Sequence, residues 1–472
     1  MAHKTGKMHG SRYFNASLFY LVLIIVILAA GLAFYGLGIA PPSGHKAEFL
    51  YSGSFYNDSV LQYDQNIYHT YSLDGNVSNF SIMLNGADIS TPTIYNGSFL
   101  VSTMGNLTIL QEGRYNIING TVERISAFNG SVEWSDTFPD QMMTQPIVIS
   151  NEIVVGMGNN AEVKPQNLNM NDGIFALNAT DGKVLWNITT IGPVMTTPAV
   201  YNGIMIAPAT STIYFINYTT GNVLKTLSIG IPDTLSSPLL VGHSAFFGAG
   251  DSSYGPYRPD YWFYSVNMLN ESFAWEDNFS IAGGGINDVS PSFWKGTVIT
   301  GYLRASNYTN QTIIGINATT GEEIWRLNEI AAEGNTSVVD ANSSLSYLYR
   351  SNFTENTMSP ITVWNGTAFA NSNFFGELFA FNTTTGQVKW IFDTGPCEAS
   401  PNVVDGRYLA IVSDPGVLYI INMNNGTLVK AIDTGMPHLS SEPVAVNNGI
   451  IFGTMTGRLV GLNLTSILSG GK

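Results

Sequence analysis

Two carboxylic acids stand at the same place in a repeated sequence element. The element is a small residue and a proline followed by apolar, turn and apolar residues. Asp288 lies three residues before Pro291, and Glu398 lies three residues before Pro401. Because burial raises the pKa of a carboxyl group towards an acidic working pH, each side chain is a candidate general acid or base. The alternative is that each one caps a turn or bonds to the backbone.

Arginine is scarce, but four arginines lie in segments that interrupt the repeats: Arg114, Arg258, Arg304 and Arg350. The last three are the candidates for binding an anion. A guanidinium keeps its charge in acid and binds a sulfonate or similar anion through two hydrogen bonds. Tyr257 and Trp262 flank Arg258 and suit a contact surface or lid. We therefore treat these three arginines and the two aromatic residues as candidate ligand-binding positions. The alternative is that the arginines are solvated loop residues.

The sequence gives no support for several other chemistries. It contains no His/Cys/Asp cluster with metal-ligand spacing, no glycine loop that cradles phosphate before a helix, and no G-x-S-x-G element. Cys397 is the single cysteine, so a disulfide cannot form within one chain. The formal net charge is −15 and no basic patch is visible, which excludes nucleic acid as a partner.

The candidate residues must be positioned by hairpins that recur along the chain. The segment IFALNATDGKVLW, Ile174 to Trp186, is typical of two strands joined by a tight turn in which Gly182 supplies a positive φ. Together with a proline element, each hairpin gives four short strands, which is one blade of a propeller. Further copies end at Trp134, Trp325 and Trp390, and two end at Leu224 and Val429 with an aliphatic residue in place of tryptophan.

The pattern A-x-[DN]-x-x-[TD]-G-x-x-x-W, at Ala176 to Trp186 and at Ala380 to Trp390, resembles the tryptophan-docking repeat of the pyrroloquinoline-quinone-type (PQQ-like) propellers. That family includes quinoprotein dehydrogenases, outer-membrane assembly lipoproteins and tetrathionate hydrolases, so the resemblance specifies fold far better than function. It implies an all-β chain with a single PQQ-like propeller whose tryptophans pack against neighbouring blades. The chain departs from the family by carrying Asn where Asp is usual, at Asn178, Asn317 and Asn382.

The spacing of the prolines predicts eight blades plus insertions. The last blade stops before an outer strand, and the alternating segment Asn66 to Leu73 is predicted to complete it by pairing with Leu459 to Asn463. The alternative is seven blades with an irregular cap. In either case the long insertions open on one face of the ring, which we predict to be the functional face. Glycosylated decoration is the alternative for these insertions.

The N-terminus predicts a membrane anchor. Residues 1–16 are basic and polar, and residues 17–40 contain an uncharged apolar run long enough for a bilayer core of ~30 Å. The basic flank places residues 41–472, the propeller, outside the cytoplasm. The length of the run favours an uncleaved, single-pass signal anchor. The alternative is a signal peptide cleaved after Gly38-Ile39-Ala40, which would release a secreted protein.

The composition predicts an external, acidic environment. Only 11% of residues are charged, against ~25% in ordinary domains, and about 22 Asn-x-Ser/Thr sequons follow Ala40. Asn keeps a hydrogen-bonding side chain whose character does not change with pH. We therefore expect an acidophile, an archaeon, with N-linked glycans. The glycosylation candidates are Asn178, Asn217, Asn317, Asn382 and Asn425.

Three functions fit these patterns. The first is a surface module that binds or assembles envelope proteins. The second is a tetrathionate-hydrolase-like enzyme that cleaves a sulfur-chain anion in acid, with Asp288 and Glu398 as catalytic residues. The third is a quinone-dependent dehydrogenase. Membership of that branch would imply a pair of adjacent cysteines and a calcium site. This sequence matches neither feature, so no cofactor is expected.

Overall fold

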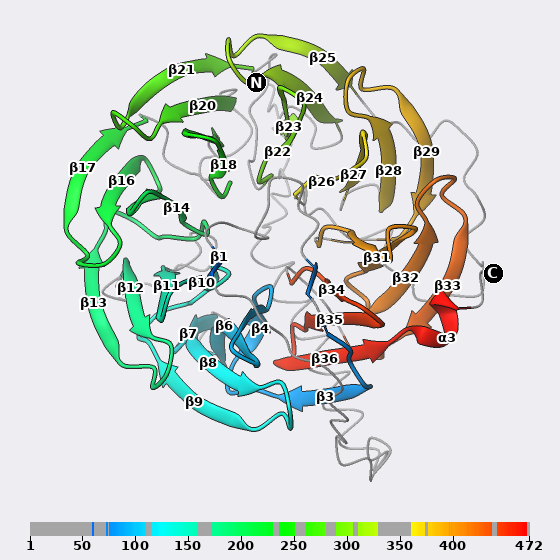
Figure 1. Ribbon diagram of the computed structural model, residues 1–472, viewed down its shortest axis with the longest axis horizontal. Coiled ribbons are helices and arrows are strands. Elements are labelled where there is room, and N and C mark those ends of the chain that lie inside the picture. The colour runs from blue at the N-terminus through cyan, green and yellow to red at the C-terminus, as the bar shows by residue number, and fades with distance from the viewer. Residues whose placement is uncertain are drawn as a thin grey trace, which may run out of the picture.

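The structure, a computed structural model, describes residues 59–60, 72–73, 75–109, 115–158, 172–229, 236–250, 261–279, 289–304, 310–328, 360–372, 376–395, 397, 399–436 and 441–469. These residues form eight sheets arranged as blades around a central axis (Figure 1). The fold is therefore an all-β propeller with eight blades, as predicted, and the alternative of seven blades with a cap is wrong.

Each of blades 1 to 7 is built from four main strands that follow one another from the axis outwards (Figure 1). They are β5 (Thr93–Tyr95), β6 (Ser98–Ile109), β8 (Thr121–Ser126) and β9 (Val132–Thr137) in blade 1; β10 (Ile147–Ile149), β11 (Glu152–Met157), β12 (Gly173–Asn178) and β13 (Val184–Thr189) in blade 2; β14 (Ala199–Tyr201), β15 (Ile204–Ala209), β16 (Thr212–Asn217) and β17 (Val223–Ser228) in blade 3; β18 (Leu239–Val241), β19 (Ser244–Gly250), β20 (Tyr261–Asn267) and β21 (Ser272–Asn278) in blade 4; β22 (Ser292–Trp294), β23 (Thr297–Arg304), β24 (Asn310–Asn317) and β25 (Glu323–Asn328) in blade 5; β26 (Thr362–Trp364), β27 (Thr367–Ser372), β28 (Glu377–Asn382) and β29 (Val388–Asp393) in blade 6; and β30 (Asn402–Val404), β31 (Tyr408–Val412), β32 (Val417–Asn422) and β33 (Leu428–Asp433) in blade 7.

Three short strands join these sheets at their margins. They are β1 (Ser59–Val60), which pairs with β10, and β4 (Ala87–Ile89) and β7 (Tyr115–Ile118), which both pair with β6. A single helical turn, α3 (Thr465–Leu468), follows the last strand. Among the described residues, no helix is both long and apolar enough to cross a membrane. The predicted anchor, residues 17–40, lies outside the described residues.

Blade 8 is closed by the N-terminal part of the chain, as predicted, but the predicted strand is wrong. Its strands are β34 (Val444–Val446), β35 (Gly449–Gly453), β36 (Arg458–Asn463) and, outermost, β3 (Phe80–Met83). Residues 66 to 73 were expected to pair with β36. Their described end, β2 (Ser72–Leu73), instead pairs in parallel with β34 at the inner edge. Phe80 pairs with Gly461, which leaves space for the phenyl ring: a Cβ at Gly461 would lie 2.0 Å from Cε1 of Phe80.

Burial follows the position of a strand within its blade. Middle strands such as β15 and β32 are buried along almost their whole length, whereas outer strands such as β17 alternate between exposed and half-buried residues. The middle strands are covered on both sides because neighbouring blades stack face to face. Eight apolar clusters result, and each is shared by two adjacent blades, so every seam of the ring is packed.

The predicted tryptophan docking is confirmed. Each indole N–H donates to a backbone carbonyl in the turn of the next blade, and each ring covers the glycine of that turn. The donor–acceptor pairs are Trp134 to Ala179 at 3.1 Å, Trp186 to Tyr218 at 2.8 Å, Trp325 to Thr383 at 3.0 Å and Trp390 to Met423 at 3.1 Å.

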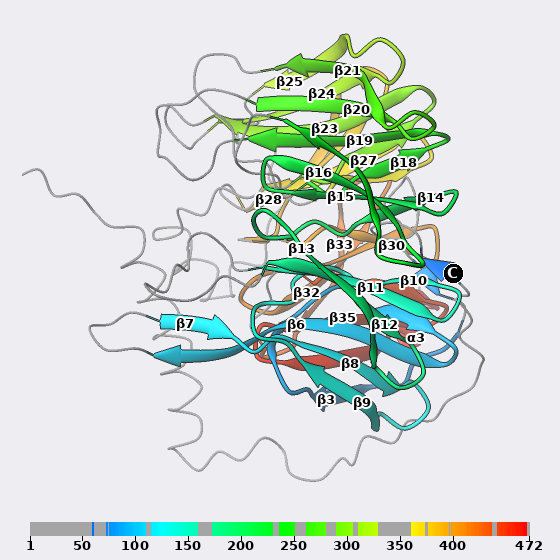
Figure 2. The same cartoon turned by 90° about the vertical axis from the view of Figure 1, so that its left-hand side faces the viewer.

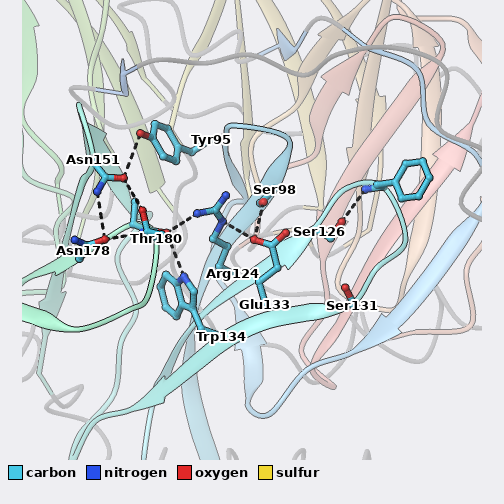
Figure 3. Close-up of polar contacts among 12 residues, drawn as sticks. Tyr95, Ser98, Arg124, Ser126, Ser131, Glu133, Trp134, Asn151, Asn178 and Thr180 are labelled. Carbon is cyan, nitrogen blue, oxygen red and sulfur yellow. Dashed lines mark hydrogen bonds and ion pairs between the residues drawn. The ribbon is translucent and has the colours of Figure 1, made fainter.

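At the first seam an arginine reinforces the indole (Figure 3). Nη1 of Arg124 donates to the same Ala179 carbonyl at 2.6 Å, and its Nε lies 2.7 Å from Oε2 of Glu133. Ser98 Oγ donates to the same Glu133 oxygen at 3.0 Å. The carboxylate holds the guanidinium in place, so that the turn of blade 2 is fixed by two donors from blade 1.

Two blades carry lysine, not the expected aliphatic residue, at the tryptophan position. A bulge in the third strand sets the pairing, which matches Phe215 with Lys225 and Ile420 with Lys430. Leu224 and Val429, assigned to that position from the sequence, therefore lie one residue early. Nζ of Lys225 donates to the carbonyl of Glu271 in the next turn at 2.6 Å, so lysine makes the same kind of contact as the indole.

Blade 4 contains a fifth docking tryptophan that the repeat search missed. Trp275 donates to the Ala318 carbonyl at 3.1 Å and covers Gly321. The hairpin of blade 4 lacks the usual turn glycine, and Glu271 occupies that place with a φ of 53°. The repeat pattern was not recognised because a non-glycine residue adopts the left-handed backbone conformation at this turn.

Candidate functional site

The two faces of the ring differ in how the strands are joined. We call the side that carries the turns between third and fourth strands the turn face. The opposite side, the loop face, carries the connections between second and third strands and the links between blades. The predicted insertions all belong to the loop face. Figure 2 shows the ring edge-on, with the paired ends of β6 and β7 projecting from the loop face.

Most candidate site residues lie outside the described residues: Asp288, Glu398, Arg258, Arg350 and Tyr257. Arg304 is the last residue of β23, where that strand reaches the loop face, and only its backbone is described. Trp262 is described. It is half-buried on β20, packs with the cluster shared by blades 3 and 4, and stacks on Tyr264 with centroids 6.5 Å apart. Its position is thus one of packing at a seam.

The residues that follow Asp288 belong to a hydrogen-bonded ring around the axis. The carbonyl of Val289 accepts from Ser236 Oγ at 2.8 Å, and Ser290 Oγ accepts from the N–H of Ser237 at 3.0 Å. Near Glu398, Ser400 Oγ donates to the Pro360 carbonyl at 2.6 Å. Equivalent bonds join the other neighbouring blades: Thr93 with Pro146, Gln145 with Thr197, Thr197 with Ser237, Ser292 with Ile361, Asn402 with Pro443, and Glu442 with Thr91.

This inner ring explains why a small hydroxyl residue precedes most of the prolines. A hydroxyl at that place reaches the backbone of the preceding blade, as Thr197, Ser237 and Ser290 do, and proline leaves no N–H unsatisfied at the start of the inner strand.

Val289, which follows Asp288, and Ser400, two residues after Glu398, take part in the inner ring in the links between blades 4 and 5 and between blades 6 and 7. Asp288 and Glu398 themselves lie outside the described residues.

Cys397 is a packing residue. Its thiol is fully buried, and Sγ donates to the carbonyls of Ala399 at 3.4 Å and Val412 at 3.2 Å. The carbonyl of Cys397 accepts from Nδ2 of the buried Asn371. Burial raises the pKa of nearby Tyr419 to about 12, with a smaller contribution from Cys397. The residue before Glu398 is therefore held inside the seam between blades 6 and 7.

A buried carboxyl group lies where blade 8 joins blade 1. Glu123, on β8, accepts from the N–H of Asn85 at 2.8 Å and from Thr121 Oγ1 at 2.9 Å. Burial raises the pKa of Glu123 above 4.5 and outweighs these hydrogen bonds, which lower it. Burial also raises the pKa of Glu152 and of Asp136. These acids belong to the framework, and they favour the folded state in acid.

We expect Glu123→Gln to flatten the pH dependence of stability. The raised pKa means that the folded protein binds this proton more tightly than the unfolded chain. The stabilisation is thus complete below pH ~4.5 and is lost as the pH rises through the folded-state pKa. Glutamine does not titrate. The melting temperature of the Glu123→Gln variant should therefore fall less than that of the wild type between pH ~3 and pH ~7. Calorimetry at both pH values measures this, with Glu322→Gln at an exposed position as the control. If the melting temperature of Glu123→Gln fell between the two pH values by as much as that of the wild type, Glu123 would not be the source of this pH dependence.

The segment between the second and third main strands of blade 1 contains an additional pair of strands. Beyond Gly105, β6 leaves its blade and pairs with β7 alone, from Asn106 with Ile118 to Ile109 with Tyr115. In the described residues this pair has no third strand. We call residues 106–118 the arm. Alternating apolar letters in NLTILQ and YNII are the signal that would have indicated strands here.

The five predicted glycosylation candidates all lie on the turn face, between third and fourth strands. Among the described residues, no group of three or more His, Cys, Asp or Glu is placed to hold a metal ion.

Comparison with known proteins places the chain in context. The sequence model of the family described as outer membrane protein assembly factor BamB matches residues 119–431 and 309–466. Tetrathionate hydrolase of Acidithiobacillus ferrooxidans is 27% identical over 227 residues, which is 43% of this chain and 44% of that protein. BamB of Shewanella oneidensis is 23% identical over 309 residues, 62% of this chain and 66% of that protein. The chain thus spans less than two thirds of each curated relative.

The fold comparison agrees. The crystal structure of BamB from Moraxella catarrhalis superposes with a TM-score of 0.58 at 15% identity, and covers 82% of this chain and 99% of that one. At this identity the likeness shows the propeller fold alone.

Proposed function

We propose a function from one premise: the chain belongs to the PQQ-like propeller family whose model is described as outer membrane protein assembly factor BamB. The protein is a surface module that binds an envelope protein through its loop face. It is anchored in the cell membrane by residues 17–40, with residues 41–472 outside the cell, in an acidophilic archaeon. The family match and the BamB relatives support an assembly role, which is the role that the name assembly factor gives to that family.

The arm is the observation that carries this proposal. A two-stranded hairpin is only marginally stable by itself in water, and each of its outer edges presents unpaired backbone N–H and C=O groups. Both strands of the arm have such an edge within the described residues, because β8 and β4 pair with β6 only up to Ser102 and Gly105. An extended segment of a partner would satisfy these groups by adding a strand.

The ring behind the arm suits a binding role. Packed seams, docked tryptophans and the inner hydrogen-bonded ring fix the blades to one another. Such a scaffold loses little conformational entropy when a partner binds its loops.

We expect shortening of the arm to abolish partner binding while the ring stays folded. In the shortened variant, Asn-Gly replaces residues 107–117, so that the paired residues Asn106 and Ile118 flank a two-residue turn. A photo-crosslinking residue at position 116 of the full-length protein, in its own membranes, should capture one discrete envelope protein. That protein should no longer co-purify with the shortened variant, whose melting temperature should stay within a few degrees of the wild type.

The matched control carries the same crosslinker at position 185, which is exposed on the outer strand β13. Equal adducts from both positions, or unchanged co-purification with the shortened arm, would refute the binding role of the arm.

A second candidate function is hydrolysis of tetrathionate. The 27% identity to a tetrathionate hydrolase supports it, together with the predicted acidic habitat and the candidate residues of the loop face. In this version Asp288 or Glu398 exchanges the proton, and Arg258, Arg304 and Arg350 bind the sulfonate ends. Neither candidate uses a quinone cofactor, because Cys397 alone cannot form the pair of adjacent cysteines typical of that branch.

A further inference from the structure

A sequon stands at the connection between the third and fourth strands of every blade. In blades 1 to 7 the acceptors are Asn129, Asn178, Asn217, Asn270, Asn317, Asn382 and Asn425. Blade 8 is assembled from both ends of the chain, and two sequons meet there: the N–H of Asn463, at the end of β36, donates to Oδ1 of Asn79, just before β3, at 2.8 Å. The eight blades therefore place a closed circle of sequons on the turn face.

The fold uses the oxygen of these side chains and leaves the nitrogen available. In Asn317, Oδ1 accepts from the N–H groups of Thr319 at 2.9 Å and Thr320 at 3.1 Å. Asn217 and Asn382 make the same two bonds in their turns. In the described structure the amide nitrogens of these three residues make no hydrogen bond. Aspartate would serve the turn equally well, since only an acceptor is needed.

The two threonines of each turn separate folding from modification. The second one is structural: Oγ1 of Thr320 accepts from the N–H of Glu322 at 3.3 Å, and Thr220 and Thr385 do the same. The first one, at Thr219, Thr319 and Thr384, is exposed, and its hydroxyl has no hydrogen bond within the part of the chain that the structure describes. The turn does not need that hydroxyl, whereas a sequon requires it.

We propose that the turn face carries a ring of N-linked oligosaccharides, with Asn217, Asn317 and Asn382 as acceptors whose amide nitrogens the turns leave without a hydrogen bond. The donor is an oligosaccharide linked through phosphate to a polyisoprenoid lipid. The amide nitrogen attacks the anomeric carbon, a C–N bond forms, and the anomeric C–O bond breaks. The lipid phosphate leaves with the electron pair, and the amide proton passes to a base of the transferase.

The ring of glycans has a consequence for docking. Polar oligosaccharides around the whole turn face would cover the short turns and hinder protein contacts there. Partners are then left with the loop face. This inference goes beyond the binding proposal and does not depend on it, because glycans on the turn face are compatible with either candidate function.

The test is glycopeptide mass spectrometry of the full-length protein from its own membranes. Peptides that contain Asn217, Asn317 and Asn382 should each carry a glycan. In a host that N-glycosylates secreted proteins, Thr319→Ala should lose one glycan mass and Thr319→Ser should retain it. Thr320→Ala is the matched control: it should keep the glycan but melt at a lower temperature, since it loses the structural hydroxyl. Unmodified peptides at all three turns of the natural protein, or an unchanged mass for Thr319→Ala, would overturn the proposal.

Discussion

Replacing Trp325 with alanine should lower the free energy of unfolding by about 3 to 5 kcal/mol, the usual cost of removing a large core aromatic. Trp325 is 8% exposed, the most buried of the docking tryptophans. Its N–H donates to Thr383 at 3.0 Å, and its ring meets Phe381 edge-on with centroids 5.8 Å apart. At ~2.1 cal/mol/K per residue, a ring of this size should melt on the order of 5 °C lower.

Trp364→Ala is the matched control, because it removes the same side chain from an inner strand where the residue is 40% exposed. Thermal melts of the two variants should differ several-fold in their shift from the wild type. Equal shifts would mean that a tryptophan docked in the seam stabilises the ring no more than an exposed tryptophan does. That result would remove the physical basis of the repeat.

The seams could be predicted well because each one is specified by a few residues that lie close together in the sequence. A tryptophan four residues after a turn glycine meets the glycine of the next blade, and a single Cβ there would lie 2.5 Å from Cε3 of Trp325, as at Gly386. The same rule failed where a letter departed from the pattern. Glu271 replaced the glycine in blade 4 and hid Trp275, and the lysines at 225 and 430 do not resemble an aromatic residue.

The closing strand was mistaken for a different reason. Alternation of apolar and polar residues in 66–73 is a property of one segment, whereas closure depends on a match between segments nearly 400 residues apart. Gly461 stands where other blades have Ala176 or Ala380, and the missing methyl group makes room for Phe80. A search for an aromatic residue opposite that glycine would have selected β3.

The candidate site stays a prediction, because Asp288 and Glu398 lie outside the described residues. Their chain neighbours Val289 and Cys397 are described, and they lie buried in the inner ring and in the seam between blades 6 and 7. The directions of the side chains depend on links that have no repeated pattern. The arm was missed for a similar reason, since its strands pair only with each other and belong to no blade.

If the hydrolase candidate is correct, Asp288→Asn should lower the turnover of tetrathionate by at least about 100-fold, the lower end of what general acid–base catalysis contributes. Asparagine matches the shape of aspartate but cannot exchange a proton. The melting temperature should not change, because the described inner-ring bonds of this link are made by the backbone of Val289 and the hydroxyl of Ser290. The measurement is release of thiosulfate and sulfate at pH ~2 to 4, where carboxyl groups titrate.

Glu398→Gln in the same assay separates the two acids. A loss in Glu398→Gln with full activity in Asp288→Asn would move the catalytic role to Glu398, the residue that follows the buried Cys397 in the chain. Full activity in both variants would refute acid–base catalysis by this pair. An inactive wild type would leave the arm and the loop face as a binding surface alone, because a rigid ring that presents open strand edges can hold a partner without any residue that moves a proton.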